Sequence, residues 1–182
     1  MKKKIFVAVN LPERVKKELE KYQEKISKSF NDFCPIKWTR KDNLHITLFF
    51  IGYVDFDELI DIFNEVERAV KKCSSFNVKM ENISYAPKKE NPKMVWVKGE
   101  KSPEMTKINK ELEKNLFETN GESNDFIPHI TLGRIIQWQF KRIDLEERPE
   151  ILEDINISFT AESIEIMESI KGGYVTLKSI NL

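Results

Sequence analysis

Both histidines of this chain lie in one short motif that occurs twice. His45 and His129 each begin the sequence His-Ile-Thr-Leu, and the 182 residues contain no other histidine. Each copy lies in an apolar, β-branched run typical of a β-strand, in which side chains alternate between two faces. Each histidine therefore shares a face with the threonine two residues later, Thr47 or Thr131. Each motif thus presents an imidazole and a hydroxyl side by side on a rigid element.

These residue types suit acid–base chemistry on a phosphate ester. Imidazole has an ordinary pKa of about 6.5, so a neutral and a protonated histidine can together deprotonate a nucleophile and protonate a leaving oxygen. Threonine hydroxyls can donate hydrogen bonds to the non-bridging phosphate oxygens, where negative charge must be held in the transition state. No metal ion is required. The repeated motif therefore predicts a two-histidine phosphoesterase, since packing alone explains two identical tetrapeptides poorly.

The composition is that of a soluble globular protein with a heavily charged surface. Hydrophobic residues make up 40% and charged residues 33% of the chain, and 30 Lys and Arg balance 30 Asp and Glu. This balance does not by itself indicate a nucleic-acid binder, although a local basic groove is compatible with it. No apolar stretch approaches the roughly 20 residues that span a bilayer. We expect one domain over residues 1–182, no membrane association and a monomer.

The cysteines and the amino terminus favour a cytoplasmic location. Cys34 and Cys73 are too few and too isolated for a disulfide framework, which indicates a reducing compartment. The apolar run after the first lysines, residues 5–9, is too short for a signal peptide. The cysteines and histidines also match no zinc-ligand spacing, so we expect neither a metal site nor a cofactor.

Around the motifs, β-rich runs alternate with amphipathic helices. Because strands outnumber helices and the loops are short, this order favours an α+β fold with antiparallel pairing. Each motif strand follows an amphipathic helix, which indicates two similar half-units. Helices are predicted to begin near Asn10, Asp55 and Ser102, the last ending at Asn120 and Gly121. The first motif strand is predicted to end at about residue 51, just before Gly52. Other strands are predicted at residues 4–9, 76–86, 94–98, 126–136, 155–167 and 174–180.

The motifs and their flanks resemble the 2H phosphoesterase superfamily, and most closely its RNA 2′,3′-cyclic phosphodiesterase branch, also called the 2′-5′ RNA ligase family. The duplicated motif carries this similarity together with residues 5–12, 38–45 and 128–134. The resemblance implies a bilobal fold of two antiparallel β-sheets with outer helices, related by a pseudo-two-fold axis. The active-site cleft would lie between the lobes, closed by residues 168–174.

The resemblance also implies an activity. It is the metal-independent hydrolysis of 2′,3′-cyclic phosphate ends of RNA, such as tRNA halves, to 2′-phosphomonoesters, and family members can join RNA halves through a 2′-5′ linkage. His45 would protonate the leaving 3′ oxygen and His129 would activate water, with Thr47 and Thr131 holding the phosphate. The two motifs themselves are symmetric and do not distinguish the acid from the base.

Four other residues are candidates for substrate binding. Arg134 would clamp a phosphate or the RNA backbone if Gly133 permits a bulge that turns it to the motif face, and would otherwise be a solvated arginine. Trp38 and Arg40 would form a groove wall for an RNA end, although a core position is the stronger alternative for Trp38. Phe49 would floor the pocket or pack between the lobes.

Two other functions are alternatives to this activity. A phosphodiesterase that acts on a small cyclic nucleotide or a 2′-5′ oligonucleotide would use the same histidines, so only a panel of substrates distinguishes it. A non-catalytic RNA-binding module that kept the cleft is less compatible with two intact histidines.

Overall fold

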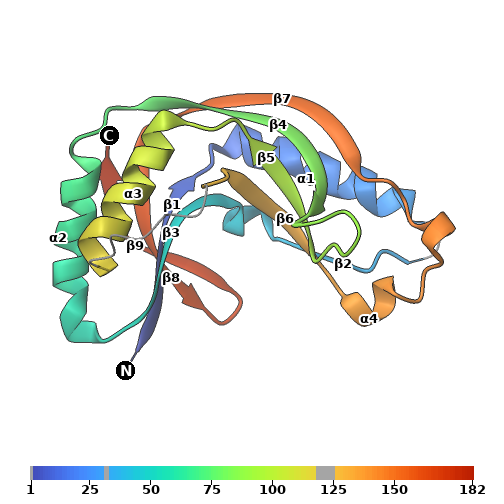
Figure 1. Ribbon diagram of the computed structural model, residues 1–182, viewed down its shortest axis with the longest axis horizontal. Helices are drawn as coiled ribbons and strands as arrows, with labels where there is room; N and C mark the ends of the chain where they lie inside the picture. Colours follow the sequence, from blue (N-terminus) through green and yellow to red (C-terminus); the bar gives the residue numbers. More distant parts are fainter. Residues whose placement is uncertain (1, 31–32, 118–125) are drawn as a thin grey trace.

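A computed structural model describes residues 2–30, 33–117 and 126–182, and in it the strands form one curved antiparallel sheet (Figure 1). The helices are α1 (Glu13–Ser29), α2 (Leu59–Val70), α3 (Pro103–Phe117) and the short α4 (Gln137–Phe140). The strands are β1 (Lys3–Asn10), β2 (Ile36–Trp38), β3 (His45–Val54), β4 (Phe76–Ala86), β5 (Met94–Gly99), β6 (His129–Ile135), β7 (Leu152–Ala161), β8 (Ser163–Ile170) and β9 (Gly173–Asn181).

The strand order, β7-β4-β5-β6-β3-β1-β8-β9, consists of two related halves that meet at β6 and β3. In each half the motif strand is innermost, and β3 pairs with β1 as β6 pairs with β5. In the sequence, α1 lies between β1 and β3, and α3 lies between β5 and β6. Within the described residues, β3 and β6 pair with each other only at Ile46 and Ile130. The α+β class with antiparallel sheets and helices is thereby confirmed, and the two expected sheets are joined edge to edge through this single pair.

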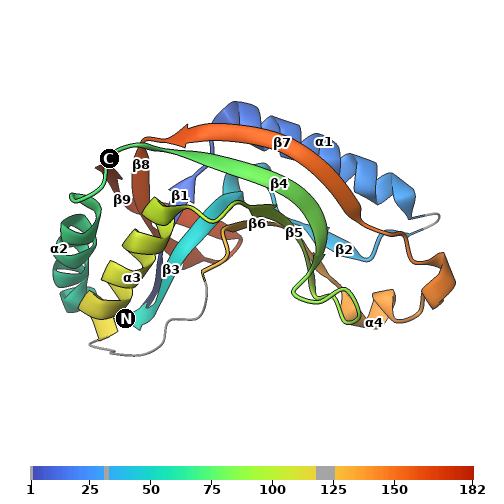
Figure 2. The same ribbon diagram turned by 45° about the horizontal axis from the view of Figure 1, so that its top comes forward.

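The helices cross between the two halves. Helix α1 follows β1 but lies along β6 and β7, where the Gln23 side-chain amide donates to the carbonyls of Thr39 at 2.9 Å and Leu132 at 3.0 Å. The Lys25 ammonium is 2.7 Å from the Glu153 carboxylate on β7. At the other end of the sheet, α2 packs against α3, and α3 packs against β3 (Figure 2). Each half therefore needs a helix from the other to complete its core.

The core explains the orientation of the motifs. Ile46 and Ile130 are fully buried and belong to one apolar cluster with Leu19 of α1 and with Ile108 and Leu112 of α3. Since side chains alternate along a strand, the histidines and threonines of the motifs must point to the opposite face, away from the helices. Burial of the apolar residues thus fixes the direction of the polar ones.

Several expected boundaries are confirmed. Asp55 and Glu58 form the predicted capping box ahead of α2. The Ser102 hydroxyl accepts a hydrogen bond from the Met105 amide at 3.2 Å and so caps α3. The predicted end of that helix at residues 120–121 lies outside the described residues.

Other boundaries are wrong for physical reasons. Asn10 is the last residue of β1 and does not cap α1, since its side-chain oxygen accepts from the adjacent Leu11 amide at 2.9 Å. The run at residues 155–167 is not one strand, because the chain passes from one half of the sheet to the other at Glu162. There β7, paired with β4, gives way to β8, paired with β1. Within the three described segments, no helix is long and apolar enough to cross a membrane.

Candidate active site

The two motifs meet in one open cavity of about 530 Å³, which is lined by His45, Thr47, His129 and Thr131 together. The central pair of the sheet brings them there. With Ile46 opposite Ile130 in an antiparallel register, His45 lies across from Thr131 and Thr47 lies across from His129. Each imidazole therefore has a threonine on its own strand and another on the neighbouring strand. This crossed arrangement can surround one tetrahedral group.

Each histidine is oriented by the backbone carbonyl two residues before it. His45 Nδ1 lies 2.8 Å from the carbonyl oxygen of Asn43, and His129 Nδ1 lies 2.8 Å from that of Ile127. Because a carbonyl oxygen only accepts hydrogen bonds, both Nδ1 atoms carry a proton, and Nε2 becomes the nitrogen that exchanges protons. His45 Nε2 lies 3.0 Å from the Thr47 hydroxyl.

Burial lowers the pKa of both imidazoles below the ordinary histidine value, because it disfavours the charged ring. The carbonyls of Asn43 and Ile127 oppose this effect by accepting from the rings. A positive charge on His129 lowers the pKa of His45 further. The two rings therefore resist being protonated together, which favours the state with one acid and one base.

Aromatic side chains produce this burial. The Trp96 ring is stacked on His129, with centroids 3.8 Å apart and planes inclined by 22°. His45 is contacted by Phe6 at 5.0 Å and edge-on by Tyr174 at 4.9 Å. These contacts hold the two imidazoles in place and exclude water from one side of each ring.

A β-bulge turns Arg134 into the cavity. The β5–β6 register shifts between Val95 and Trp96, so that Leu132 has no counterpart on β5. The alternation along β6 resumes in the opposite phase after Leu132, and Arg134 lines the cavity with the histidines. The structure thus places this arginine on the motif face, in the cavity with both histidines.

Gly133, next to that bulge, lets β2 approach β6 closely, and Gly133→Ala is expected to disturb both stability and the site. An added Cβ would lie 2.5 Å from Ile36 Cγ2 and 2.8 Å from Trp38 Cε3. Relieving this overlap must shift β2 or β6, so we expect the free energy of unfolding to fall by about 1–3 kcal/mol, as in other overpacked cores. Urea unfolding measures this change. An unchanged unfolding midpoint would show that β2 moves aside without cost.

Two of the predicted binding residues lie outside the cavity lining. Trp38 packs against the core, which was the stronger of its two predicted positions, and its indole nitrogen donates to the Ser27 hydroxyl of α1 at 2.7 Å. The Arg40 guanidinium donates to the carbonyl of Gly172 in the β8–β9 turn. Arg40 therefore supports the hairpin that carries Tyr174 and does not itself line the cavity.

Phe49 is displaced from the cavity by a second bulge. The β1–β3 register shifts between Val7 and Ala8, which pair with Phe49 and Thr47, so Leu48 is the extra residue. Phe49 consequently packs against the core, and the next residue, Phe50, lines the cavity. The prediction that Phe49 floors the pocket does not hold for this cavity, but Phe49 lines a second pocket of about 350 Å³ together with Thr47 and His129. The two motif strands carry equivalent bulges, with Phe50 at the position that Arg134 occupies on β6.

The lining also includes residues that were not predicted individually, although Ser169 and Tyr174 lie in the segment 168–174 that was expected to close the cleft. Most lie on β1, β5, β8 and β9, and their alternation with buried residues was the only available signal. Among the described lining residues there are two cations, Lys4 and Arg134, and no carboxylate, which suits an anionic ligand. The additional lining residues are Lys4, Phe6, Thr39, Asn43, Phe50, Met94, Trp96, Ser169 and Tyr174.

Comparison with known proteins agrees with this geometry. The family described as LigT-like phosphoesterase matches residues 9–96. An RNA 2′,3′-cyclic phosphodiesterase of Thermotoga maritima is 32% identical over 133 residues, which are 71% of this chain and 68% of that protein. One from Methanocaldococcus jannaschii is 28% identical over 168 residues, 91% of each chain.

Solved structures share the fold at low sequence identity. The protein TT0787 of Thermus thermophilus superposes with a TM-score of 0.80 at 23% identity, covering 98% of this chain and 97% of that one. Escherichia coli LigT complexed with 3′-AMP has a TM-score of 0.74 at 20% identity, covering 100% of this chain and 99% of the other. The arrangement of the two halves is therefore common to these proteins.

Proposed function

This chain belongs to the LigT-like phosphoesterase family, and we propose that it hydrolyses 2′,3′-cyclic phosphate ends of RNA to 2′-phosphomonoesters. The observation that carries the proposal is the pair of His-x-Thr motifs, each with Nδ1 held by a carbonyl and Nε2 left for proton exchange. The cations in the cavity suit the phosphate, and the names of the relatives support a cyclic phosphate on RNA.

In the proposed reaction, His129 Nε2 accepts a proton from a water molecule, whose oxygen attacks the phosphorus. The bond from phosphorus to the 3′ oxygen breaks, and His45 Nε2 donates its proton to that oxygen. Thr47 and Thr131 donate hydrogen bonds to the non-bridging oxygens, where charge accumulates. One proton is taken up and one is released, so the two histidines exchange protonation states in each turnover.

The surroundings of the histidines support this assignment of acid and base. Tyr174 contacts the His45 ring, and the exposed Phe50 lies 6.0 Å from the buried Phe6 beside that ring, so exposed surfaces on which a nucleoside can stack gather at His45. The aromatic ring beside His129, that of Trp96, is already stacked on the imidazole. The leaving 3′ oxygen belongs to that nucleoside. At the equivalent position on β6 stands Arg134, a partner for phosphate oxygens. The proposed acid therefore lies on the nucleoside side of the cavity, and the proposed base lies on the strand that carries Arg134.

The test is to incubate the protein, in EDTA, with an oligoribonucleotide that ends in a 2′,3′-cyclic phosphate. Mass spectrometry and phosphatase mapping identify the product, which we expect to carry a 2′-phosphate. A 3′-phosphate product would mean that the bond to the 2′ oxygen breaks instead. A strict need for a divalent metal would refute the two-imidazole mechanism. If the protein hydrolyses free cyclic nucleotides or 2′-5′ oligonucleotides but not RNA ends, those compounds are its substrates.

The pH dependence follows from the lowered pKa values. Catalysis needs one neutral and one protonated imidazole, so kcat/KM is expected to be bell-shaped, with apparent values belonging to the pair. Because the pKa of each ring in the free protein is lowered, the maximum should lie below about pH 6.5, the ordinary histidine value. A bound phosphate anion stabilises the charged rings, so the kcat profile should lie at higher pH.

Rate measurements between about pH 4.5 and 9 on one substrate check both profiles, since this range spans the ordinary histidine pKa. In His45→Ala, residual turnover no longer needs a protonated acid, so the alkaline limb should disappear. A kcat/KM maximum well above about pH 7 would contradict the lowered pKa values.

A further inference from the structure

Strand β3 continues beyond the cavity with another exposed aromatic side chain on the same face. Phe50 lines the cavity and is 66% exposed, and Tyr53 is 70% exposed. Residues three apart normally lie on opposite faces of a strand, but the β1–β3 register skips a residue here, where Gly52 has a φ of +99°. Phe50 pairs with Phe6, and Tyr53 pairs with Lys4. Since Phe6 and Lys4 both line the cavity, Tyr53 extends the same surface.

Lys4 adds a positive charge to this surface. Its ammonium lies 5.9 Å from the centroid of the Tyr53 ring, and on its other side Lys4 pairs with Ser169, which also lines the cavity. Exposed aromatic rings beside a cation are the combination with which proteins bind single-stranded nucleic acid, because bases stack on the rings and the cation meets the backbone phosphates. Large exposed aromatic side chains also have little reason to gather at a site edge without a ligand.

We infer that Tyr53 and Lys4, beside Phe50, form a subsite for the nucleotide immediately 5′ of the terminal cyclic nucleotide. The inference rests on the proposed function and gives the substrate a minimum length. Its direction follows from the chemistry, since the terminal nucleoside lies at His45 and its 5′ oxygen leads to the next nucleotide. That nucleotide leaves the cavity along β3, where its base stacks on Tyr53 and the linking phosphate meets Lys4.

The experiment compares two substrates, a free nucleoside 2′,3′-cyclic phosphate and a tetranucleotide that ends in the same cyclic nucleotide. Tyr53→Ala should lower kcat/KM on the tetranucleotide about 5- to 150-fold, the equivalent of losing about 1–3 kcal/mol of stacking of one base. Hydrolysis of the free nucleotide, which lacks the 5′ neighbour, should not change. Lys4→Gln should weaken the salt dependence of binding to the tetranucleotide more than that of binding to the free nucleotide.

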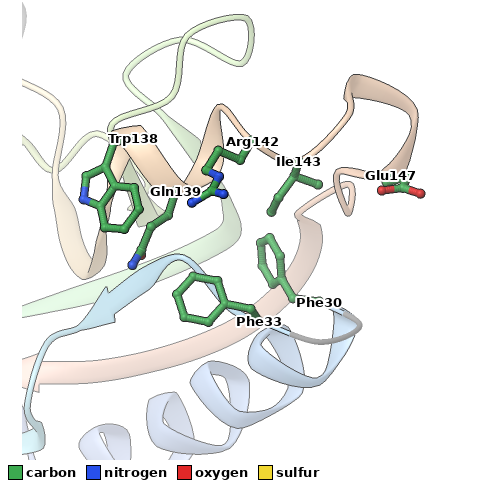
Figure 3. Close-up of a pocket in the computed structure, with 7 residues that line it drawn as sticks. All are labelled: Phe30, Phe33, Trp138, Gln139, Arg142, Ile143 and Glu147. Carbon is green, nitrogen blue, oxygen red and sulfur yellow. The ribbon is translucent and has the colours of Figure 1, made fainter.

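Trp138→Ala is the matched control. Trp138 is 63% exposed, like Tyr53, but lies on α4 in a separate cavity with Phe33 and Arg142 (Figure 3). Its replacement should leave both substrates unaffected. An equal loss on both substrates in Tyr53→Ala, or no loss on either, would overturn the subsite.

A binding measurement separates this inference from the proposed function. The probe is a labelled tetranucleotide that ends in a 2′-phosphate, with affinity measured by fluorescence anisotropy. If no cyclic phosphate is hydrolysed but Tyr53→Ala still weakens binding of this probe, the subsite stands and the proposed reaction falls. If hydrolysis occurs and Tyr53→Ala binds the probe as tightly as the native protein, the subsite falls and the reaction stands.

Discussion

Replacing either His45 or His129 by alanine is expected to lower kcat on an RNA 2′,3′-cyclic phosphate by about 10²–10⁴-fold, the usual contribution of a positioned acid or base. Each ring faces the cavity and not the core, so its removal should leave the fold intact. Rates are measured with enzyme in excess, and circular dichroism and urea unfolding verify the fold. A folded single variant with near-native rates would remove the two-imidazole mechanism.

A modified substrate can assign the roles of the two histidines. If the bridging 3′ oxygen is replaced by sulfur, the leaving group departs as a thiolate and needs no general acid. His45→Ala should then recover most of the lost rate, whereas His129→Ala, which lacks the base, should remain slow. Recovery in His129→Ala instead would make His129 the acid and His45 the base. Recovery in neither variant would mean that neither ring protonates the leaving group.

The sequence was sufficient for the motif strands because their apolar residues follow a regular alternation. Ile46 and Ile130 must enter the core, and this alone turns the histidines and threonines to the other face. The same argument failed one residue beyond the first motif, whereas at the second motif Gly133 indicated the bulge that turns Arg134 to the motif face. A bulge inserts one unpaired residue and reverses the phase, so Phe50 replaced Phe49 in the cavity. A bulge depends on pairing with a neighbouring strand, which periodicity along a single strand does not contain.

The other positions that could not be predicted from the sequence depend on long-range contacts. Tyr174 reaches His45 because β8 and β9 form a hairpin beside β1, and Arg40 holds the turn of that hairpin. Trp38 lies outside the predicted groove because α1 packs across the opposite half of the sheet, where the Ser27 hydroxyl accepts a hydrogen bond from the Trp38 indole. Each of these positions depends on which elements become neighbours. Residue types and spacing within one segment do not encode that information.

Thr131→Val is expected to lower kcat by about 10²–10³-fold, the loss measured when one donor to a developing oxyanion is removed. Valine keeps the shape and β-branching of threonine and so preserves the strand. If the hydroxyl donates only in the transition state, kcat and kcat/KM should fall by the same factor. Thr131→Ser keeps the hydroxyl and should retain most of the activity. Thr160→Val, at an exposed position on β7, is the control for the substitution itself.

The two threonines should nevertheless differ, because their hydrogen bonds do. Thr47 Oγ1 lies 3.0 Å from His45 Nε2, so Thr47→Val removes a partner of the acid as well as a phosphate donor. It should therefore displace the alkaline limb of the pH–rate profile, whereas Thr131→Val should lower the rate equally at every pH. Measuring both pH–rate profiles tests whether the contact between Thr47 and His45 affects catalysis. Identical displacements in the two variants would mean that both hydroxyls act through the histidines and not directly on the phosphate.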